Sequence, residues 1–224
     1  MSNVIAVDGP SGAGKSSVSK LVGKRLGYLH VDSGALYRIM TWQALARGVD
    51  VSDPAAVAAF ADKVEIECRP EDGAVVYYVN GEIPGDRIRT PEINANASAV
   101  ATVKEVRDRI TAMLRAMADL GNLVVEGRDI ATAVFPDSPA RFYLTASAEA
   151  RARRRRKEEI DKGVANQSEE AVKASLLARD HIDSTRSHAP LRKADGALEI
   201  DSSDMTLEEV VEAVISALPD GWAK

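Results

Sequence analysis

The segment GPSGAGKSS at positions 9–17 has the composition and spacing that point most directly to chemistry. It fits the pattern G-x-x-x-x-G-K-[ST], with Gly9, Gly14, Lys15 and Ser16 at the fixed positions. Glycines let successive backbone N–H groups converge on phosphate oxygens at the positive end of a following helix. The lysine adds a mobile charge for the β- and γ-phosphates, and the Ser16 hydroxyl is a candidate Mg²⁺ ligand. The predicted nucleotide-binding residues are Gly9, Pro10, Ser11, Gly12, Ala13, Gly14, Lys15, Ser16 and Ser17.

The segments on either side of this loop are those that a triphosphate site requires. The apolar run at residues 4–7 predicts a buried strand before the loop. An amphipathic helix is predicted after it, with an apolar face formed by Val18, Leu21, Val22 and Leu26. An ordinary glycine-rich turn between a strand and a helix is the alternative interpretation. The motif in this context favours the triphosphate site.

Six cationic residues lie within the seven positions 151–157. Arg151 and Arg155 are four residues apart, so they face the same way on a helix. A charge run is usually a solvated face, and the acidic residues that follow could pair with it. The chain is acidic overall and contains a phosphate loop, so we favour a mobile lid that closes over phosphates.

A second polar cluster lies at the end of the next predicted helix. Arg179, Asp183 and Arg186 are spaced at i, i+4 and i+7, so they share one face. One interpretation is an exposed network on the surface. The other is an aspartate that holds two guanidinium groups rigid for bidentate contact with phosphate. His181 lies on a different face and is predicted to be a surface residue.

Two further polar pairs follow apolar strands. Arg128 and Asp129 come directly after a predicted strand, and an ion pair that only caps the loop is the alternative to a role in the site. Asp32 and Ser33 end another strand, and Ser33 is most simply a helix N-cap. The carboxyl ends of parallel strands meet at one edge of a sheet, so we expect these pairs and the phosphate loop to open onto one crevice.

Strands alternate with helices through most of the chain, which predicts an α/β fold with a parallel sheet covered on both faces. The predicted strands are residues 4–7, 27–32, 123–125, 141–144 and 197–200. The predicted helices are 35–47, 54–61, 90–120, 148–162, 169–187 and a last one with a capping box at Thr206 and Glu209, and a loop is predicted at 163–167. Residues 64–83 interrupt the alternation. There, 64–68 and 74–79 followed by Asn80-Gly81 predict a hairpin, and hence a small antiparallel sheet.

Composition narrows the class of protein. A chain of 224 residues with 45% apolar residues suits one soluble α/β domain with insertions. The net charge of −5 argues against a general nucleic-acid binder, and the single cysteine, Cys68, cannot form an internal disulfide. The N-terminus enters a strand by Val4, and no long apolar run follows. We therefore expect a cytoplasmic protein without a membrane segment, and a monomer, because no exposed apolar stripe is evident.

Taken together, the motifs resemble those of one family. They are IAVDGPSGAGKSS at 5–17, VDSGALYR at 31–38, DRIRTPEI at 86–93, EGRDIATAVFPDS at 126–138 and RDHIDSTR at 179–186. Over nearly its whole length the chain resembles the bacterial cytidylate kinases, in the nucleoside monophosphate kinase group of P-loop proteins. The resemblance implies one domain over residues 1–224, divided into three parts. These are a core (1–35, 103–147 and 188–224), a monophosphate-binding insertion (about 36–102) that contains the antiparallel sheet, and a short helical lid (about 148–187).

The resemblance also implies roles for particular side chains. The monophosphate side would be lined by Ser33, Arg38, Arg89, Ser98, Arg107, Arg128, Asp129, Arg179, Asp183 and Arg186. Of these, Ser98, Arg179 and Asp183 match positions around the cytosine or ribose, and Arg38, Arg128 and Arg186 match positions near the phosphates. Arg151 and Arg155 match lid arginines that reach the transferring group. The implied catalytic residues are Lys15, Arg128, Arg151, Arg155, Arg179 and Arg186, with Mg²⁺ at Ser16.

The chain departs from the family pattern at two places near the expected Mg²⁺. Glu126 stands where an aspartate is common, and its longer side chain bears on any Mg²⁺-linked role. The hydroxyl pair of the loop is Ser16-Ser17, where some relatives have Gly-Thr. Which hydroxyl approaches the metal is left open.

The implied activity is transfer of the γ-phosphate of ATP to CMP and dCMP, with Mg²⁺, in pyrimidine nucleotide metabolism. One alternative keeps the fold but changes the acceptor to another monophosphate or to a small metabolite such as shikimate. The insertion and the many arginines disfavour a small uncharged acceptor. Another alternative is a nucleotide-dependent switch. A GTPase-type switch needs a base-recognition segment, and the sequence contains no N-K-x-D.

Overall fold

The computed structural model describes residues 2–161, 163 and 167–222. Its strands form one seven-stranded sheet in the order β3-β4-β2-β5-β1-β6-β7. The strands are β1 (Val4–Asp8), β2 (Leu29–Asp32), β3 (Ile66–Glu71), β4 (Ala74–Val79), β5 (Leu123–Gly127), β6 (Ala140–Thr145) and β7 (Leu198–Asp201). From β2 to β7 all neighbours pair in parallel, so their carboxyl ends form a single edge. The predicted fold class is confirmed.

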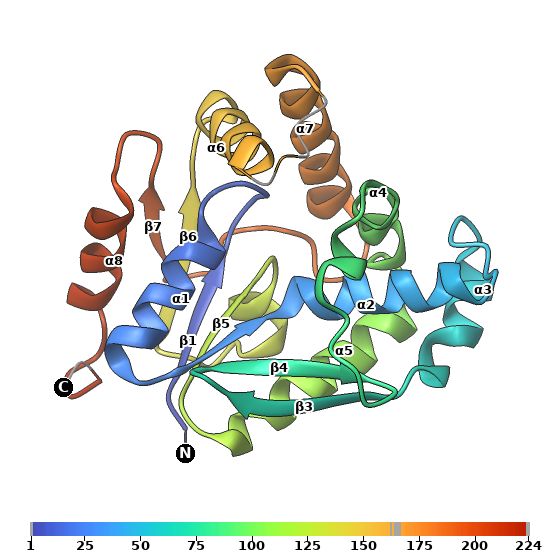
Figure 1. The fold of residues 1–224 in the computed structure, drawn as a ribbon. Helices are drawn as coiled ribbons and strands as arrows, with labels where there is room; N and C mark the ends of the chain where they lie inside the picture. The colour runs from blue at the N-terminus through green and yellow to red at the C-terminus, as the bar shows by residue number, and fades with distance from the viewer. Residues whose placement is uncertain (1, 162, 164–166, 223–224) are drawn as a thin grey trace.

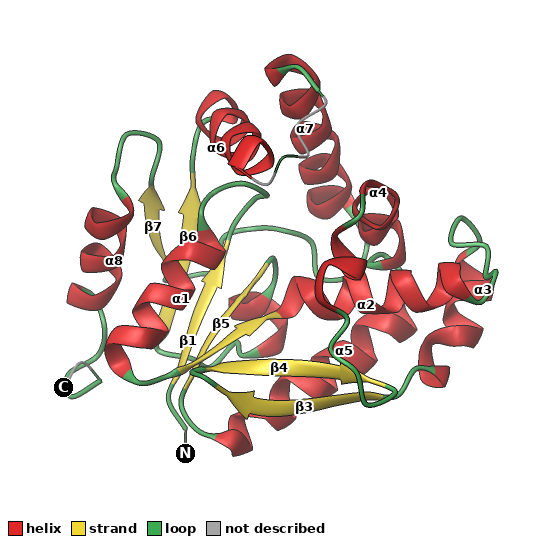
Figure 2. Ribbon diagram, viewed as in Figure 1, coloured by secondary structure: helices red, strands yellow, loops and turns green. Residues whose placement is uncertain are grey.

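Helices cover both faces of this sheet (Figure 2). They are α1 (Lys15–Leu26), α2 (Ser33–Ala46), α3 (Pro54–Phe60), α4 (Pro91–Val100), α5 (Lys104–Ala116), α6 (Ala148–Asp161), α7 (Glu169–Thr185) and α8 (Leu207–Ser216). Alternate residues of β1 show why two layers form. Val4 and Ala6 pack with α2 and α5, whereas Ile5 and Val7 pack with α1 and α8. A strand buried on both faces reads as a continuous apolar run, as β1 does.

The predicted hairpin forms, but its turn lies elsewhere than predicted, and the hairpin joins the main sheet. β3 and β4 pair antiparallel from Ile66↔Val79 to Glu71↔Ala74, with the turn at Asp72-Gly73. Asn80-Gly81 instead closes a second, single-bridge turn between Val79 and Glu82. The hairpin is not a separate sheet, because β4 joins β2 through His30↔Ala74. Both turns place residues at positive φ, and the sequence pattern did not distinguish between them.

The long helix predicted at residues 90–120 is also divided. α4 ends at Val100, a turn follows, and α5 begins at Lys104 and continues into a 3₁₀ turn at Met117–Leu120. Other boundaries agree within about two residues, and the predicted capping box of Thr206 and Glu209 is present at α8. The loop predicted at 163–167 and the helix end predicted at residue 162 fall partly outside the described residues.

Figure 1 shows where the two polar helices lie. α6 and α7 pack against each other above the carboxyl ends of β1 and β6, and α4 packs against α7. The phosphate loop, which joins β1 to α1, therefore opens toward these helices. No helix among the described residues combines the length and apolarity that a membrane crossing requires.

Candidate active site

The phosphate loop has a backbone that other residues could not easily adopt. Gly9, Gly12 and Gly14 have φ of 147°, 81° and 89°. A Cβ atom on Gly9 would lie 1.9 Å from the backbone oxygen of Leu144, so only glycine fits against β6. Gly14 caps α1 without a side-chain hydrogen bond, and the first turn of α1 contains no acidic residue. The positive end of the helix is thus left available to an anion.

Lys15 is buried beneath this loop. Its Nζ atom donates a hydrogen bond of 2.7 Å to the backbone oxygen of Pro10. Burial, together with the nearby positive charge of Arg128, lowers the pKa of Lys15 to about 7. A phosphate group placed in the loop would favour the charged form of Lys15, as the nearby carboxylates of Glu126, Asp8 and Asp180 already do in part.

Ser16 and Glu126 bring two oxygen donors together beside the loop. The Ser16 hydroxyl donates to Glu126 Oε2 at 2.8 Å, and the other carboxylate oxygen, Oε1, lies 2.9 Å from His30 Nε2. Ser17 is exposed. Mg²⁺ takes hard oxygen ligands and is held by one or two protein groups together with water and phosphate. The pair of Ser16 and Glu126 fits such an ion.

Ser33 has a different role from the N-cap that was predicted. The side chain of Asp32 caps α2 by accepting a hydrogen bond from the backbone N–H of Ala35. Ser33 lies inside the helix, and its hydroxyl donates to the backbone oxygen of Glu126 at 2.6 Å. The prediction was wrong because either residue can cap a helix, and the contact with β5 decides between them.

A buried network of arginines and aspartates lies beside the loop. Asp129 accepts hydrogen bonds from Arg107 on α5 and, at 3.3 Å, from Arg186. Asp183 on α7 accepts from Arg128 Nε at 2.9 Å and lies 3.7 Å from Arg186. All of these side chains are buried except Arg128, which is 21% exposed. The expected pairing of Asp183 with two arginines is met for Arg186, but the second arginine is Arg128 rather than Arg179.

A second group of arginines gathers at the end of β2. Asp32 Oδ2 accepts from Arg38 at 2.8 Å and lies 3.6 Å from Arg89. Burial alone would raise the pKa of Asp32, but the charges of Arg38 and Arg89 outweigh it and hold that pKa below its ordinary value. Ser98 is buried on α4, the helix that packs against α7.

Arg179 on α7 has unmet hydrogen-bonding capacity. Its Nε atom is buried without a partner among the described residues. Burial and the positive charge of Arg128 lower the pKa of Arg179 to about 10. Such a group is suited to an anionic or carbonyl partner from outside the chain.

The two arginines of α6 that were expected to belong to a lid have different partners. Arg151 donates to the backbone oxygen of Ser11 at 3.0 Å and pairs with Asp180. Asp180 in turn accepts from the backbone N–H of Ser11 at 3.2 Å, so both helices touch the phosphate loop. Arg155 instead pairs with Glu158 and Glu159 on its own helix, as the solvated-face interpretation predicts.

The family assignment rests on the whole chain rather than on the loop alone. The model of the cytidylate kinase family matches residues 5–220. The chain belongs to the cytidylate kinase family. It is 45% identical to the cytidylate kinase of Streptomyces avermitilis, over 97% of this chain and 93% of that protein. It is 41% identical to the cytidylate kinase of Shouchella clausii, over 96% of both chains.

A solved structure supports the fold. An uncharacterized protein from Eubacterium ventriosum superposes with a TM-score of 0.51 over 96% of both chains, at 11% sequence identity. This likeness concerns the fold alone. Membership of the cytidylate kinase family makes the chain a kinase, and the site described above is where its phosphate chemistry is expected.

Sequence reasoning missed three residues that lie beside the loop and its neighbouring helices: Asp8, His30 and Asp180. Each contacts a segment that is distant in the chain, so no local spacing marked it. Asp8 ends β1 and accepts hydrogen bonds of 2.8 Å from the backbone N–H groups of both Ile130 and Ala131. It ties the segment after β5 to the strand that leads into the phosphate loop. An acidic residue that ends an apolar strand was the only signal.

The protonation of Asp8 should make stability depend on pH. Burial raises the pKa of Asp8 to about 6, from 3.8. The folded state then binds the proton more tightly than the unfolded state. The stabilisation is present below about pH 4 and is lost as pH rises through 6, by on the order of 3 kcal/mol.

Asp8→Asn should remove this dependence. The free energy of unfolding is measured by urea denaturation from pH 4.5 to 7. As pH rises, the difference between Asp8→Asn and the wild type should shift in favour of the variant, because the wild type alone loses stability. Exposed Asp204→Asn serves as the control. Parallel curves for Asp8→Asn and wild type would contradict the assignment.

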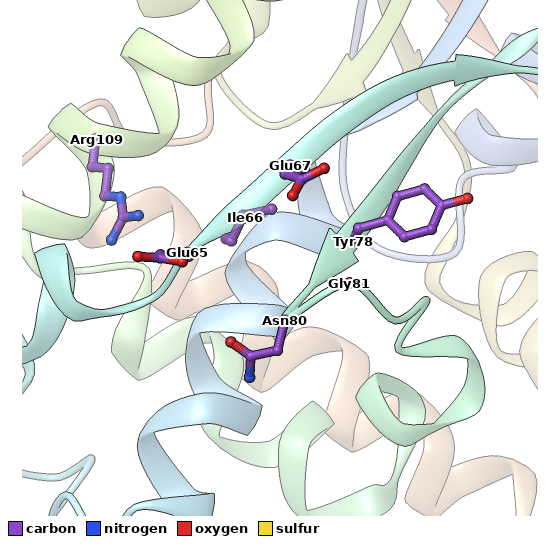
Figure 3. A pocket seen from close by; sticks show the side chains of 7 residues that line it. All are labelled: Glu65, Ile66, Glu67, Tyr78, Asn80, Gly81 and Arg109. Carbon is purple, nitrogen blue, oxygen red and sulfur yellow. The ribbon is translucent and has the colours of Figure 1, made fainter.

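A separate pocket of about 370 Å³ lies at the hairpin. Figure 3 shows its lining side chains, with Arg109 reaching from α5 toward Glu65, just before β3. Arg109 donates to the backbone oxygens of Ala61 and Val64. None of the predicted site residues lines this pocket, so we assign it no part in the phosphate chemistry.

Proposed function

We propose that this protein transfers the γ-phosphoryl group of ATP to CMP, and also to dCMP, in one cleft at the carboxyl edge of the sheet. Membership of the cytidylate kinase family makes the chain an ATP-dependent kinase that converts CMP to CDP. The observation that supports the single cleft is the position of Arg128. Its charge acts on Lys15 of the phosphate loop, and its Nε atom binds Asp183 of the arginine network.

The donor side consists of the phosphate loop, Gly9 to Ser17, with Ser16 and Glu126 as the residues that would hold Mg²⁺. When bound, Mg²⁺ supplies positive charge that neutralises the β- and γ-phosphate oxygens. Lys15 adds a further positive charge from beneath the loop, and the backbone N–H groups orient the triphosphate. The result is positioning and charge neutralisation, which phosphoryl transfer needs most.

The acceptor side is the arginine network. Arg38, Arg128 and Arg186 would contact the phosphate of CMP, while Ser98, Arg179 and Asp183 would contact its base or ribose. Ser33, Arg89, Arg107 and Asp129 complete this side. The aspartates hold the guanidinium planes in place, so little order has to be created on binding. No general base is required, because a phosphate with a second pKa of about 6 is already ionised at neutral pH.

The segment 148–187 would close over the cleft. Arg151 and Arg155 would cover the transferring group, and closure would exclude water and so suppress hydrolysis of ATP. In this structure Arg155 is held by Glu158 and Glu159, so it would have to exchange those partners for phosphate. The core (1–35, 103–147, 188–224) would carry the phosphate loop, and the acceptor side would combine residues of the core, the insertion (36–102) and the segment 148–187.

The experiment that tests the proposed function is steady-state kinetics with ATP and a panel of acceptors. CMP and dCMP should be phosphorylated with higher kcat/KM than UMP, AMP or GMP. Equal or faster turnover of UMP or AMP would remove the cytidylate assignment while leaving a kinase. ATP hydrolysis in the absence of any acceptor should be slow.

Ser16 and Ser17 should differ in their effect on the metal requirement. Both serines are exposed at the start of α1, but among the described residues it is the Ser16 hydroxyl that contacts Glu126. Ser16→Ala should therefore raise the Mg²⁺ concentration needed for half-maximal activity about tenfold, in the range typical for loss of a group at a metal site. Ser17→Ala should raise it less. A larger shift for Ser17→Ala would exchange the two roles.

A further inference from the structure

A histidine lies buried behind the expected metal site. The His30 side chain is 7% exposed, and its neighbour Glu126 is 6% exposed. The two residues come from adjacent strands, β2 and β5, and His30 stands opposite Val124 in the register. Side chains two residues apart on a strand share a face, so His30 and Glu126 project to the same side of the sheet, where α1 packs. The loop motif that predicts a phosphate site gives no reason for a histidine here.

The hydrogen bonds of Glu126 show which atom of this histidine is the donor. An ionised carboxylate has only acceptors to offer, so the His30 Nε2 atom, 2.9 Å from Glu126 Oε1, carries the hydrogen. Oε2 of the same carboxylate accepts from Ser16. Both oxygens of Glu126 are therefore held, one from inside the sheet and one from the end of the phosphate loop.

The length of the Glu126 side chain makes such a hold useful. Glutamate has one more rotatable bond than aspartate, and fixing a rotatable side chain costs conformational entropy. The Ser33 hydroxyl anchors the backbone oxygen of Glu126 but not its carboxylate. The contact with His30 fixes the carboxylate itself, and with it the direction in which Oε2 faces Ser16.

We propose that His30 is a positioning residue that orients the Glu126 carboxylate for Mg²⁺ through its Nε2–H group. The inference rests on the proposed function, since it assumes that Ser16 and Glu126 hold the ion. His30 does not touch substrate or metal. It acts through Glu126, as groups behind metal ligands generally do.

Two substitutions separate this role from simple packing. His30→Gln places an amide N–H close to where Nε2 stood, whereas His30→Leu fills a similar volume and has no donor. We expect His30→Leu to bind Mn²⁺ about tenfold more weakly in the presence of a non-hydrolysable ATP analogue. His30→Gln should restore most of the wild-type affinity. The readout is free Mn²⁺ measured by electron paramagnetic resonance, which does not depend on turnover.

Analogue binding in EDTA distinguishes the possible failures. It should be the same in wild type and both variants, because the phosphate loop itself is unchanged. If wild type with the analogue binds no Mn²⁺, the proposed metal site fails. If wild type binds Mn²⁺ but both variants match it, or both are equally weak, the role of His30 is overturned.

A replacement variant and a second background keep the test valid if His30→Leu does not fold. His30→Phe retains a flat ring without a donor and takes its place. In a Glu126→Ala background, replacing His30 should change Mn²⁺ affinity no further, because no carboxylate is left to orient. An additional loss in that background would also overturn the proposal.

Discussion

Replacing Lys15 with methionine should lower kcat with ATP and CMP by about two to three orders of magnitude. Methionine keeps an unbranched side chain of similar length but carries no charge. Lys15 is buried, and its Nζ atom already sits beneath the loop on the Pro10 carbonyl. A charge held in place before the reaction stabilises the transition state without reorganisation, and this is often the largest single catalytic contribution.

The size of this effect can be separated from a loss of folding. Burial disfavours the charged form of Lys15, as its lowered pKa shows. Replacing this buried charge with an apolar side chain should therefore leave the protein at least as stable as the wild type. Thermal melting of both proteins would check this. Lys20→Met, on the exposed side of the same helix, is the matched control and should keep wild-type kcat. A loss of less than tenfold for Lys15→Met would show that the loop works without this charge.

Replacing Asp129 with asparagine should reduce the free energy of unfolding by about 3 kcal/mol or more. Asparagine has nearly the same shape but no charge. Arg107 and Arg186 would then remain buried without the carboxylate that joins them. Removing one partner of a buried ion pair costs more than the pair itself contributes, because the remaining charges stay out of water.

Urea denaturation measures this loss, and exposed Asp137→Asn on the same segment is the control, with an expected change within about 0.5 kcal/mol. If uncompensated charge is the cause, adding CMP or inorganic phosphate should recover part of the stability, because an anion can replace the carboxylate. The KM for CMP should also rise, since Arg186 and Arg107 lose their fixed orientation. A change in stability below about 1 kcal/mol would mean that the network does not depend on Asp129.

The phosphate loop was predictable because its determinants are contiguous. Glycines at positive φ, a lysine and a hydroxyl at fixed spacing follow from local geometry, and the strand before them is marked by an unbroken apolar run. The capping box of α8 was predictable for the same reason. Even so, the exclusion of a Cβ at Gly9 by the Leu144 oxygen depends on β6, which lies far along the chain.

Helical spacing predicted which residues share a face but not what that face meets. Arg151 and Arg155 lie on one face of α6, yet one reaches the phosphate loop and the other pairs within its own helix. Arg179, Asp183 and Arg186 also share a face. Their burial comes from partners elsewhere in the chain: α4 packs against α7, and Arg186 shares Asp129 with Arg107 of α5.

The sequence by itself determined the class of chemistry, the order of strands and helices, and the loop that binds phosphate, because each depends on neighbours in the chain. Only the tertiary structure decided the partners: Asp32 rather than Ser33 as the cap of α2, Asp180 for Arg151, and His30 for Glu126. For Arg151 and Asp180 the physical reason is the packing of α6 against α7, and for the cap of α2 and the contact of His30 with Glu126 it is the strand order. β5 lies between β1 and β2 in the sheet although it comes later in the chain, and no local period encodes that insertion.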